Sequence, residues 1–391
     1  MNILTINSGS SSIKFSLYGD ELRLLYEGEL SAIGGAAKLE LRDAAGANLA
    51  AQVGEVKAAT VEEAIALVER AVNLPDLPPV EAVGYRVVHP GPRLRGHQRL
   101  TPEVLAELRA ARAFAPLHDP EAVQIIEETM RRFPAIPHFA CFDTVFHETM
   151  PEEATIYALP EEVRAEGVRR YGFHGLSCES VVVQMRAAGK LPRRMVIAHL
   201  GSGCSVTACV DARSVDTTMG LTPTGGVVMG TRPGDLDPGV IFYLLRREGA
   251  TVDRVEAMLN HEAGLKALGG VNDMRELRRR EAMGDDSAQL AIRVFCRSVV
   301  KAVAGFIALY GADALVFTGG IGENDWATRE TVAAGLRRLG VEIDAANRGE
   351  ETGMRRLSAE GAEIAAWVVP AVEDRMIARH VAEMLREHAD A

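Results

Sequence analysis

The chain has 391 residues, of which 47% are hydrophobic and 25% are charged, which is typical of a globular protein and excludes a disordered or collagen-like chain. Its 43 Lys and Arg against 54 Asp and Glu give a net charge of −11, which argues against general binding to nucleic acids or to anionic membranes. At about 150 residues per domain, the length predicts two domains.

The composition also favours a cytoplasmic protein without a membrane partner. No run of about 18 apolar residues is present, and the first residues lack the basic region of a signal peptide. The five cysteines are an odd number without a C-x-x-C pair, which favours reduced thiols over a disulfide framework or a zinc site.

Predicted strands and helices alternate along the chain, which indicates α/β layers. Residues 3–17 predict a strand, a turn of small residues and a second strand. Thr101-Pro102 and Asp119-Pro120 each combine an N-cap residue with a proline at the first helical position, which predicts two helix starts. The other predicted elements are helices at 61–72, 287–310 and 374–385 and strands at 136–142 and 314–317. In the helix at 287–310, the residues expected on or near one apolar face are Leu290, Ala291, Val294, Val299, Val303, Phe306 and Ile307.

The strand–turn–strand pattern of the N-terminus returns at residues 195–211. Ser202-Gly203 corresponds there to Ser8-Gly9, about half a chain earlier. One hairpin with a Gly/Ser tip in each half indicates two related domains. Two unrelated hairpins would give the same pattern, so both interpretations stay open.

Three glycine-rich turns follow predicted strands, at Asn7–Ser12, Leu200–Gly203 and Gly319–Asn324. Because glycine has no side chain to block the approach, backbone N–H groups in such turns can converge on an anion. Lys14 adds a positive charge near the first turn, and the third turn is placed to open a helix. A plain tight turn explains each one singly. Three such turns at the ends of predicted strands favour a nucleotide site, although neither the P-loop motif nor the dinucleotide-binding motif is present.

Two arginines and a histidine occupy unusual positions. Arg86 lies within an apolar strand pattern and Arg232 in a tight loop. A guanidinium can hold a carboxylate or a phosphoryl group through two parallel hydrogen bonds; pairing with a nearby Asp or Glu is the alternative for each. Glycines and aromatic residues flank His174, which indicates an exposed histidine rather than a structural one.

Two carboxylates are candidates for holding a metal ion. Asp143 ends a predicted buried strand and Glu373 precedes the last helix. An N-cap role for Asp143 and stabilisation of a first helical turn by Glu373 are the alternatives.

Together these groups match the requirements of phosphoryl transfer. The transition state spreads negative charge over the phosphoryl oxygens, and fixed cations with aligned hydrogen-bond donors stabilise it. An anionic acceptor adds a repulsion of roughly 4 kcal/mol for two unit charges about 4 Å apart at an effective dielectric of about 20. Two arginines offset that repulsion, whereas a sugar hydroxyl would need a general base.

The chain resembles the acetate kinase family, within the acetate and sugar kinase, Hsp70 and actin superfamily, over nearly its whole length. Tyr171–Gly175 and Met229–Arg232 are its most specific motifs. The resemblance implies an α/β fold of two ribonuclease H-like domains facing a central cleft, and usually a homodimer. We expect an N-terminal domain at 1–147 plus 375–391, which includes the closing helix, and a nucleotide-binding domain at 148–374.

The resemblance also implies the reaction and the site residues. The reaction is direct, in-line and reversible transfer of the γ-phosphoryl group of ATP to acetate or a similar short-chain acid such as propionate, with Mg²⁺ or Mn²⁺, giving ADP and an acyl phosphate. Asn7 and Glu373 would serve the metal site, Arg86 would hold the carboxylate of the acid, and His174 and Arg232 would stabilise the phosphoryl group.

Asp143 has the position of the family's catalytic carboxylate. Because a carboxylate acceptor is already deprotonated, we expect Asp143 to orient the metal rather than to act as a base. The implied contacts with the acid are Val88, Leu117, His118, Phe173 and Pro223. The implied contacts with the nucleotide are Lys14, His199, Leu200, Gly201, Ser202, Gly203, Asp273, Met274, Arg275, Gly320, Ile321, Gly322, Glu323 and Asn324.

The surroundings of these residues depart from the family pattern. Tyr85 replaces the histidine of G-H-R and could, like Leu176, reshape the acid pocket. The family's charged reaction centre is kept in this chain. The resemblance therefore supports the type of reaction more strongly than it supports acetate as the substrate. The positions that differ are Tyr85, Asp119, Leu176, Cys178, Ser202, Ala371, Val372 and Asp374.

Two other functions stay open. A sugar or polyol kinase of the same fold would need an Asp base beside a hydrophilic pocket. A non-enzymatic actin- or chaperone-like nucleotide-binding protein would assemble or move with ATP, but no filament insertion or peptide-binding domain is recognisable. The Gly319–Asn324 turn argues against a carboxylate kinase that uses pyrophosphate in place of ATP, because this turn indicates an adenosine pocket.

Overall fold

The computed structural model describes residues 1–9, 12–75, 77–111, 119–349 and 352–389. The chain divides into two compact units. Unit 1 comprises Met1–Val145 with Val372–Ala391, and unit 2 comprises Phe146–Ala371. The domain boundaries expected after residues 147 and 374 stay a prediction.

Unit 1 is built on a mixed sheet whose described strands follow the order β4-β3-β2-β1-β5-β7-β6. β1 and β2 pair antiparallel, with Ile6 opposite Phe15, so the hairpin predicted at 3–17 is confirmed. β1, β5 and β7 run parallel. The strands are β1 (Ile3–Gly9), β2 (Ser12–Tyr18), β3 (Leu24–Ser31), β4 (Lys38–Asp43), β5 (Ala82–Val87), β6 (Gln98–Arg99) and β7 (His138–Phe142).

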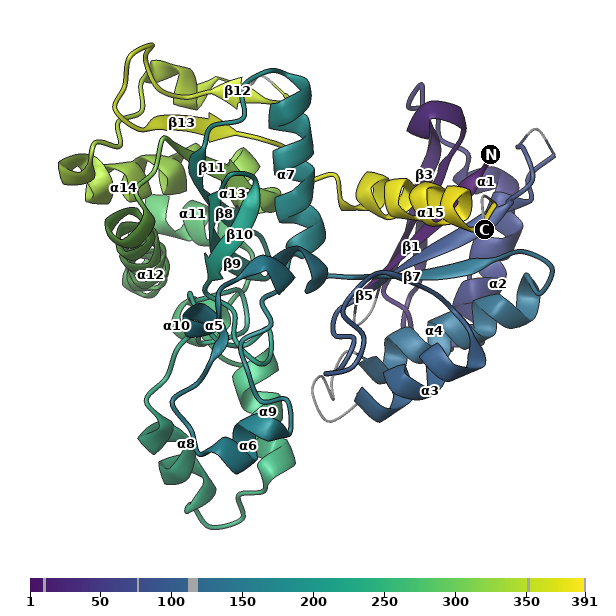
Figure 1. Cartoon of the computed structure of the whole chain (residues 1–391), viewed down its shortest axis with the longest axis horizontal. Helices are drawn as coiled ribbons and strands as arrows, with labels where there is room; N and C mark the ends of the chain where they lie inside the picture. Colours follow the sequence, from purple (N-terminus) through teal and green to yellow (C-terminus); the bar gives the residue numbers. More distant parts are fainter. Residues whose placement is uncertain (10–11, 76, 112–118, 350–351, 390–391) are drawn as a thin grey trace. The chain divides into compact units, whose positions relative to one another are not determined.

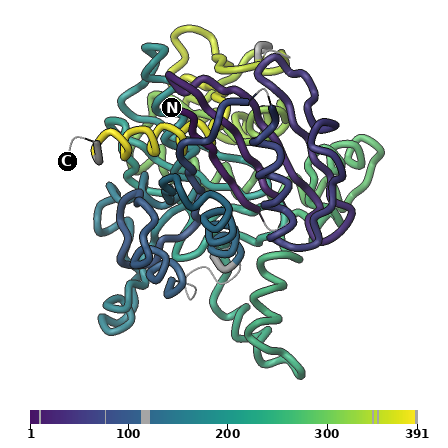
Figure 2. Tube along the Cα trace, turned by 90° about the vertical axis from the view of Figure 1, so that its right-hand side faces the viewer, coloured from purple at the N-terminus to yellow at the C-terminus, as the bar shows by residue number. Residues whose placement is uncertain are grey.

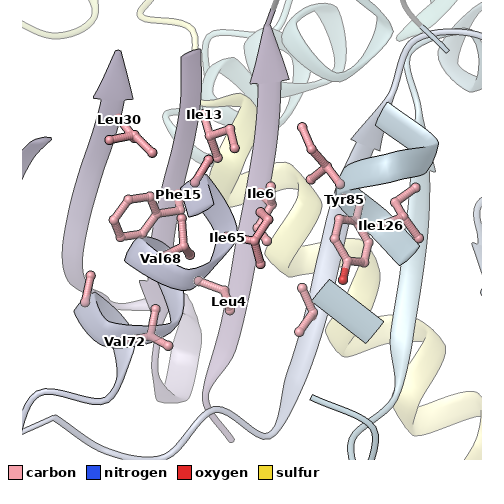
Figure 3. Close-up of a cluster of buried hydrophobic side chains, with 14 of the residues drawn as sticks. Leu4, Ile6, Ile13, Phe15, Leu30, Ile65, Val68, Val72, Tyr85 and Ile126 are labelled. Atoms are coloured by element: carbon pink, nitrogen blue, oxygen red, sulfur yellow. The ribbon is translucent and has the colours of Figure 1, made fainter. Parts of the chain in front are cut away.

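Helices cover both faces of this sheet, with α2 and α4 on one and α15 on the other (Figure 1). Ile65 and Val68 of α2 pack on Leu4 and Ile6 of β1 in the main apolar cluster (Figure 3). The predicted cap of α3 is present, because the Thr101 side chain accepts a hydrogen bond from the backbone of Val104 at 3.3 Å. The helices are η1 (Asp20–Leu22), α1 (Ala50–Val53), α2 (Val61–Val72), α3 (Pro102–Ala110), α4 (Asp119–Arg132) and α15 (Glu373–Ala389).

The last helix is fitted closely to β5. A Cβ atom on Gly84 would lie 2.6 Å from Cγ2 of both Ile377 and Val381. A larger residue at Gly84 would therefore push α15 away from the sheet, which makes the C-terminal segment part of the core of unit 1.

Unit 2 repeats this plan with the described strand order β10-β9-β8-β11-β13-β12. β8 and β9 form the predicted second hairpin, and β8, β11 and β13 run parallel. The order β3-β2-β1-β5-β7 of unit 1 thus recurs as β10-β9-β8-β11-β13, which favours related domains over unrelated hairpins. The strands are β8 (Arg194–Leu200), β9 (Cys204–Val210), β10 (Arg213–Thr217), β11 (Ala314–Thr318), β12 (Arg355–Arg356) and β13 (Ala365–Val368).

The longest helix of this part of the chain, α12, corrects one prediction. Leu290 is 45% exposed, so its expected place on the apolar face is wrong. The buried stripe includes Ala288 and Ile292; Leu290 is two residues, about 200° of rotation, from each. The helices of unit 2 are α5 (Glu152–Thr155), α6 (Glu161–Ala165), α7 (Gly175–Ala187), α8 (Pro238–Leu245), α9 (Val252–His261), α10 (Gly264–Gly269), α11 (Met274–Ala282), α12 (Asp286–Tyr310), α13 (Gly319–Asn324), α14 (Trp326–Leu336), η4 (Arg337–Leu339) and η5 (Ala345–Arg348), with η3 (Val145–Thr149) at the boundary.

One apolar helix of unit 2 lies open to solvent. None of the eight residues of α8 is buried, and Phe242 and Tyr243 are 55% and 68% exposed. α8 and α9 extend away from the sheet of unit 2 in both views (Figures 1 and 2). Among the described residues, no helix is both long and apolar enough to cross a bilayer.

Candidate active site

The carboxyl ends of β5 and β7 bring two charged residues of unit 1 together. Arg86 lies on β5 opposite Cys141 of β7. Asp143 follows β7, and its backbone N–H donates to the carbonyl of Val87 at 3.1 Å. Carboxyl ends of parallel strands meet at one edge of a sheet, where open α/β folds bind ligands.

Arg86 and Asp143 form the centre of this cluster. Oδ2 of Asp143 accepts hydrogen bonds from Nε of Arg86 at 3.0 Å and from Nη2, and Oδ1 of Asn7 accepts one from Nη1 at 3.3 Å. The Asp143 side chain is fully buried. Burial opposes the charge on Arg86, but the carboxylates of Asp143 and Glu373 outweigh it and raise the pKa of Arg86. The guanidinium therefore stays charged in one fixed orientation, and the carboxylate pairing considered as the alternative for Arg86 is present.

Two carboxylates at the start of α15 join the cluster. Nδ2 of Asn7 donates to Oε2 of Glu373 at 3.3 Å and to Oδ1 of Asp374 at 3.5 Å. Oγ of Ser16 donates to Oδ2 of Asp374 at 3.2 Å. Burial raises the pKa of both carboxyl groups, and the charge of Arg86 counteracts the rise at Glu373.

The composition of this cluster suits a hard divalent cation. Oδ1 of Asp143 is buried and has no hydrogen-bond partner among the described residues. Three carboxylates face Arg86 and Lys14, so the cluster carries excess negative charge. Mg²⁺ and Mn²⁺ prefer such oxygen ligands. Asp374 is missing from the predicted set, although its place beside Glu373 in the same first helical turn is a usable signal.

The remaining predicted residues of unit 1 are spread more widely. Lys14 is largely exposed, with Nζ 3.9 Å from Oε2 of Glu29, and lines a hollow of about 350 Å³ that also includes Asp374. Val88 follows β5 and is partly buried. Two predicted acid contacts, Leu117 and His118, lie outside the described residues.

In unit 2, His174 and His199 form a stacked pair. His174 is only 8% exposed, so the exposed position expected from its flanking glycines is wrong. It is the N-cap of α7 with a φ of 58°, in the left-handed region that residues other than glycine seldom adopt. Its ring centroid lies 4.1 Å from that of His199. Nδ1 of His174 is 3.0 Å from Oγ of Ser205, and Nδ1 of His199 is 2.8 Å from Oγ of Ser177. These contacts fix both rings before any ligand binds.

His174 and Arg232 both approach Gly203, at the tip of the β8–β9 hairpin. A Cβ atom on Gly203 would lie 3.1 Å from Nε2 of His174 and 3.6 Å from Nη1 of Arg232. The same Nη1 donates to the carbonyl of Pro223 at 3.1 Å. Because residue 203 has no side chain, the space between an imidazole and a guanidinium stays open, which is suited to an anion such as a phosphoryl group. Phe173, the other acid contact predicted in this unit, is buried beside His174 in the chain.

A cavity of about 920 Å³ lies between the hairpin tip, the start of α11 and the α13–α14 segment. Gly319 adopts a φ of 76°, and a Cβ atom there would lie 2.8 Å from the carbonyl oxygen of Leu200; glycine is therefore required where α13 meets the hairpin. The predicted nucleotide contacts that line the cavity are Gly201, Ser202, Asp273, Met274, Arg275, Gly320, Ile321 and Asn324.

Other predicted nucleotide contacts form the support of the cavity rather than its lining. His199 and Leu200 are buried in β8, and Gly322 is buried in α13. Oε1 of Glu323 accepts a hydrogen bond from the backbone of Ala371 at 3.0 Å. The lining residues that the sequence analysis missed are Asn272, Arg278, Asp325, Trp326 and Ala327. A tryptophan two residues after a glycine-rich turn is the signal that could have indicated Trp326.

Tyr85, which we expected from the sequence to reshape the acid pocket, lies elsewhere. Tyr85 is 1% exposed and points into the core of unit 1 (Figure 3), where its hydroxyl lies 2.7 Å from Nδ1 of His138. Successive residues of a strand face opposite sides, so Tyr85 points away from the side of Arg86 and does not line a pocket around it. Leu176 and Cys178 are buried in α7.

The chain is similar to known proteins over nearly its whole length. Residues 2–379 match the model of the acetokinase family. An acetate kinase from Rhodopseudomonas palustris (strain ATCC BAA-98 / CGA009) is 40% identical over 409 residues, which cover 97% of both chains. One from Deinococcus radiodurans is 43% identical over 399 residues, again 97% of both chains.

Two solved structures resemble the chain over nearly its whole length. A propionate kinase from Francisella tularensis subsp. tularensis SCHU S4 gives a TM-score of 0.89 at 35% identity, covering 97% of this chain and 98% of that one. The Porphyromonas gingivalis acetate kinase gives a TM-score of 0.87 at 31% identity, covering 98% and 99%.

Proposed function

This chain belongs to the acetokinase family, and from that premise we propose that it transfers the γ-phosphoryl group of ATP reversibly to acetate or propionate, giving ADP and an acyl phosphate. Its fold is the α/β fold of the acetate and sugar kinase, Hsp70 and actin superfamily that the sequence predicted. The observation that carries the proposal is the assembly of Arg86, Asp143 and Glu373 at one edge of the unit 1 sheet.

The unit 1 cluster is assigned to the acid and the metal. Asp143 holds two N–H groups of Arg86, so the guanidinium presents its Nη1 side, which makes only a 3.3 Å bond to Asn7. We assign this side to the carboxylate of the acid, whose charge it neutralises. Asp143 and Glu373, with Asn7, would hold the metal ion. When bound, Mg²⁺ neutralises charge on the phosphate oxygens.

The reaction itself needs no general base. A carboxylate oxygen of the acid attacks the γ-phosphorus, the bond from that phosphorus to the β–γ bridging oxygen breaks, and ADP leaves with the electron pair. His174 and Arg232, which approach Gly203 from two sides, stabilise the charge on the phosphoryl group in transfer. We assign the cavity of unit 2 to the nucleotide.

Assembly and location are part of the same proposal. The exposed apolar helix α8 supports a homodimer in which a second copy covers it, because apolar patches of this kind mark association surfaces. A cytoplasmic enzyme follows from the reduced cysteines and from the nucleotide substrate.

The decisive experiment measures ATP-dependent acyl hydroxamate formation with acetate, propionate and butyrate in the presence of Mg²⁺. Activity with at least one of the first two acids is expected, and none after chelation of the metal. Turnover of glycerol or glucose without turnover of any acid would replace the proposal by a sugar kinase. The family match does not favour that alternative.

A further inference from the structure

Trp326 places an aromatic ring on the wall of the unit 2 cavity. Within the described part of the chain, it is the only aromatic residue that lines the cavity. It is also 42% exposed, so part of its side chain is accessible to a ligand. An aromatic ring on the wall of a cavity is a typical contact for a planar ligand.

The indole is held on one side by a charged network. The guanidinium of Arg348 lies 4.6 Å from the indole ring centroid, and Glu330 binds Arg348 through hydrogen bonds of 2.8 and 3.0 Å. Arg348 does not line the cavity. The cavity therefore meets the opposite face or the edge of the indole, and the covered face is closed to a ligand.

The backbone of Trp326 is fixed as well. Nδ2 of Asn347 donates to the Trp326 carbonyl at 3.0 Å. Nε of Arg329 in turn donates to Oδ1 of Asn347 at 2.7 Å, and its Nη1 donates to the carbonyls of Gly322 and Glu323. A buried arginine thus joins the end of α13 to the start of α14, so the indole stands at a preset place before a ligand binds.

We propose that the open face of Trp326 stacks on the base of the bound nucleotide and gives the cavity its preference for purine nucleoside triphosphates. The inference rests on the proposed function in one respect, that the cavity binds the nucleotide. A purine offers a larger ring face than a pyrimidine, and inorganic tripolyphosphate offers none. Arg348 on the far side of the ring adds a cation–π contact that keeps the indole in place.

Fluorescence tests the contact without relying on catalysis. The chain has two tryptophans, and the second, Trp367 in β13, does not line the cavity. The Trp367→Phe variant therefore reports on Trp326 alone. ATP and GTP are expected to quench its emission, CTP to quench it less, and tripolyphosphate to leave it unchanged. Emission that no nucleotide alters would overturn the proposal.

The kinetics of two further variants distinguish an aromatic stacking contact from a contact that any large apolar side chain could make. Trp326→Leu keeps an apolar side chain without an aromatic face, and is expected to raise the KM for ATP by roughly 5- to 100-fold, the usual range for one stacked base. Its kcat at saturating ATP and its KM for the acid should not change. Trp326→Phe should restore most of the affinity, and Trp367→Phe should behave as the native protein.

The two failures are distinguishable. If the native enzyme phosphorylates acids and Trp326→Leu has an unchanged KM for ATP, the stacking contact is wrong and the proposed function stands. If no acid is phosphorylated but ATP quenches Trp326, the proposed function is wrong and the base contact stands.

Discussion

Single side chains in the charged clusters owe their positions to buried partners rather than to the substrates. Arg86 is oriented by Asp143, and His174 by Ser205 and the ring of His199. Fixed donors lower the cost of reorganisation when charge develops in the transition state. Substitutions that keep charge but change shape are therefore expected to be costly.

Arg232 gives the clearest prediction at this scale. Arg232→Ala is expected to lower kcat by on the order of 10³-fold, since arginines that stabilise a transferring phosphoryl group contribute at least that much. Arg232→Lys should recover only part of the loss, because an ammonium lacks the fork of two donors. Acyl phosphate formation at saturating substrates measures both. The exposed Arg338, replaced by Ala, is the matched control, and a loss below tenfold for Arg232→Ala would remove its assigned role.

His138 gives a prediction about pH. Its Nε2 lies 2.9 Å from the Phe133 carbonyl and its Nδ1 2.7 Å from the Tyr85 hydroxyl, an arrangement that fits the neutral ring. Burial lowers the pKa of His138, while the Phe133 carbonyl opposes the shift. The unfolded chain then binds a proton that the folded chain excludes, so the free energy of unfolding should fall as the pH drops below about 6.5. Urea unfolding at pH 7.5 and 5.5 should show a smaller fall in His138→Gln; equal falls would contradict the assignment.

Among the elements, the β8–β9 hairpin matters most, because its tip sets the space between His174 and Arg232. Gly203→Ala adds a methyl group 3.1 Å from Nε2 of His174. We expect kcat/KM for ATP to fall at least tenfold with little change in thermal stability, measured by initial rates and by differential scanning calorimetry.

Gly305, inside α12, is the matched control for that substitution. A Cβ atom there meets no atom within 4 Å, and alanine is the better helix former. Gly305→Ala should raise the free energy of unfolding by about 0.5–1 kcal/mol with native activity. If both variants lose activity alike, the effect at Gly203 is not local.

Interactions between residues that lie close together in the chain explain which parts of the fold could be predicted from the sequence. Both hairpins, the α3 cap and the strand that ends before Asp143 depend on alternation, capping and turn residues that lie close together in the chain. Leu290 was misplaced because adjacent apolar residues on a helix allow more than one stripe. Asp374 and Trp326 lie close in the chain to predicted site residues, which is a signal in the sequence, but only packing decides which neighbours of a motif face the same cluster or cavity.

The site residues show the same limit. Arg86 and Asp143 could be paired from sequence because parallel strands end together. The inward direction of Tyr85 follows from strand alternation once Arg86 is assigned outward, an inference the sequence allowed. The roles of these residues stay predictions until the variants are measured.

For the molecule as a whole, α8 predicts association. Phe242 is 55% exposed on a helix without a buried residue. Phe242→Glu is expected to convert a dimer into a monomer in sedimentation experiments, because a second copy could cover the helix only by burying an unpaired charge. Met283→Glu, at an apolar residue that is 65% exposed, should sediment as the native protein. A monomeric native protein would refute the proposed dimer.

The division of unit 1 into two sequence segments has a consequence for synthesis. Residues 1–145 leave the ribosome early, but the helix that packs on Gly84 and supplies Glu373 is translated after unit 2. The whole of unit 2 is made in between. A nascent chain that ends between residues 327 and 372 would carry all the residues that line the cavity of unit 2, but neither a finished first core nor a full set of carboxylates, so the charged cluster of unit 1 forms only after residues 372–389 are made.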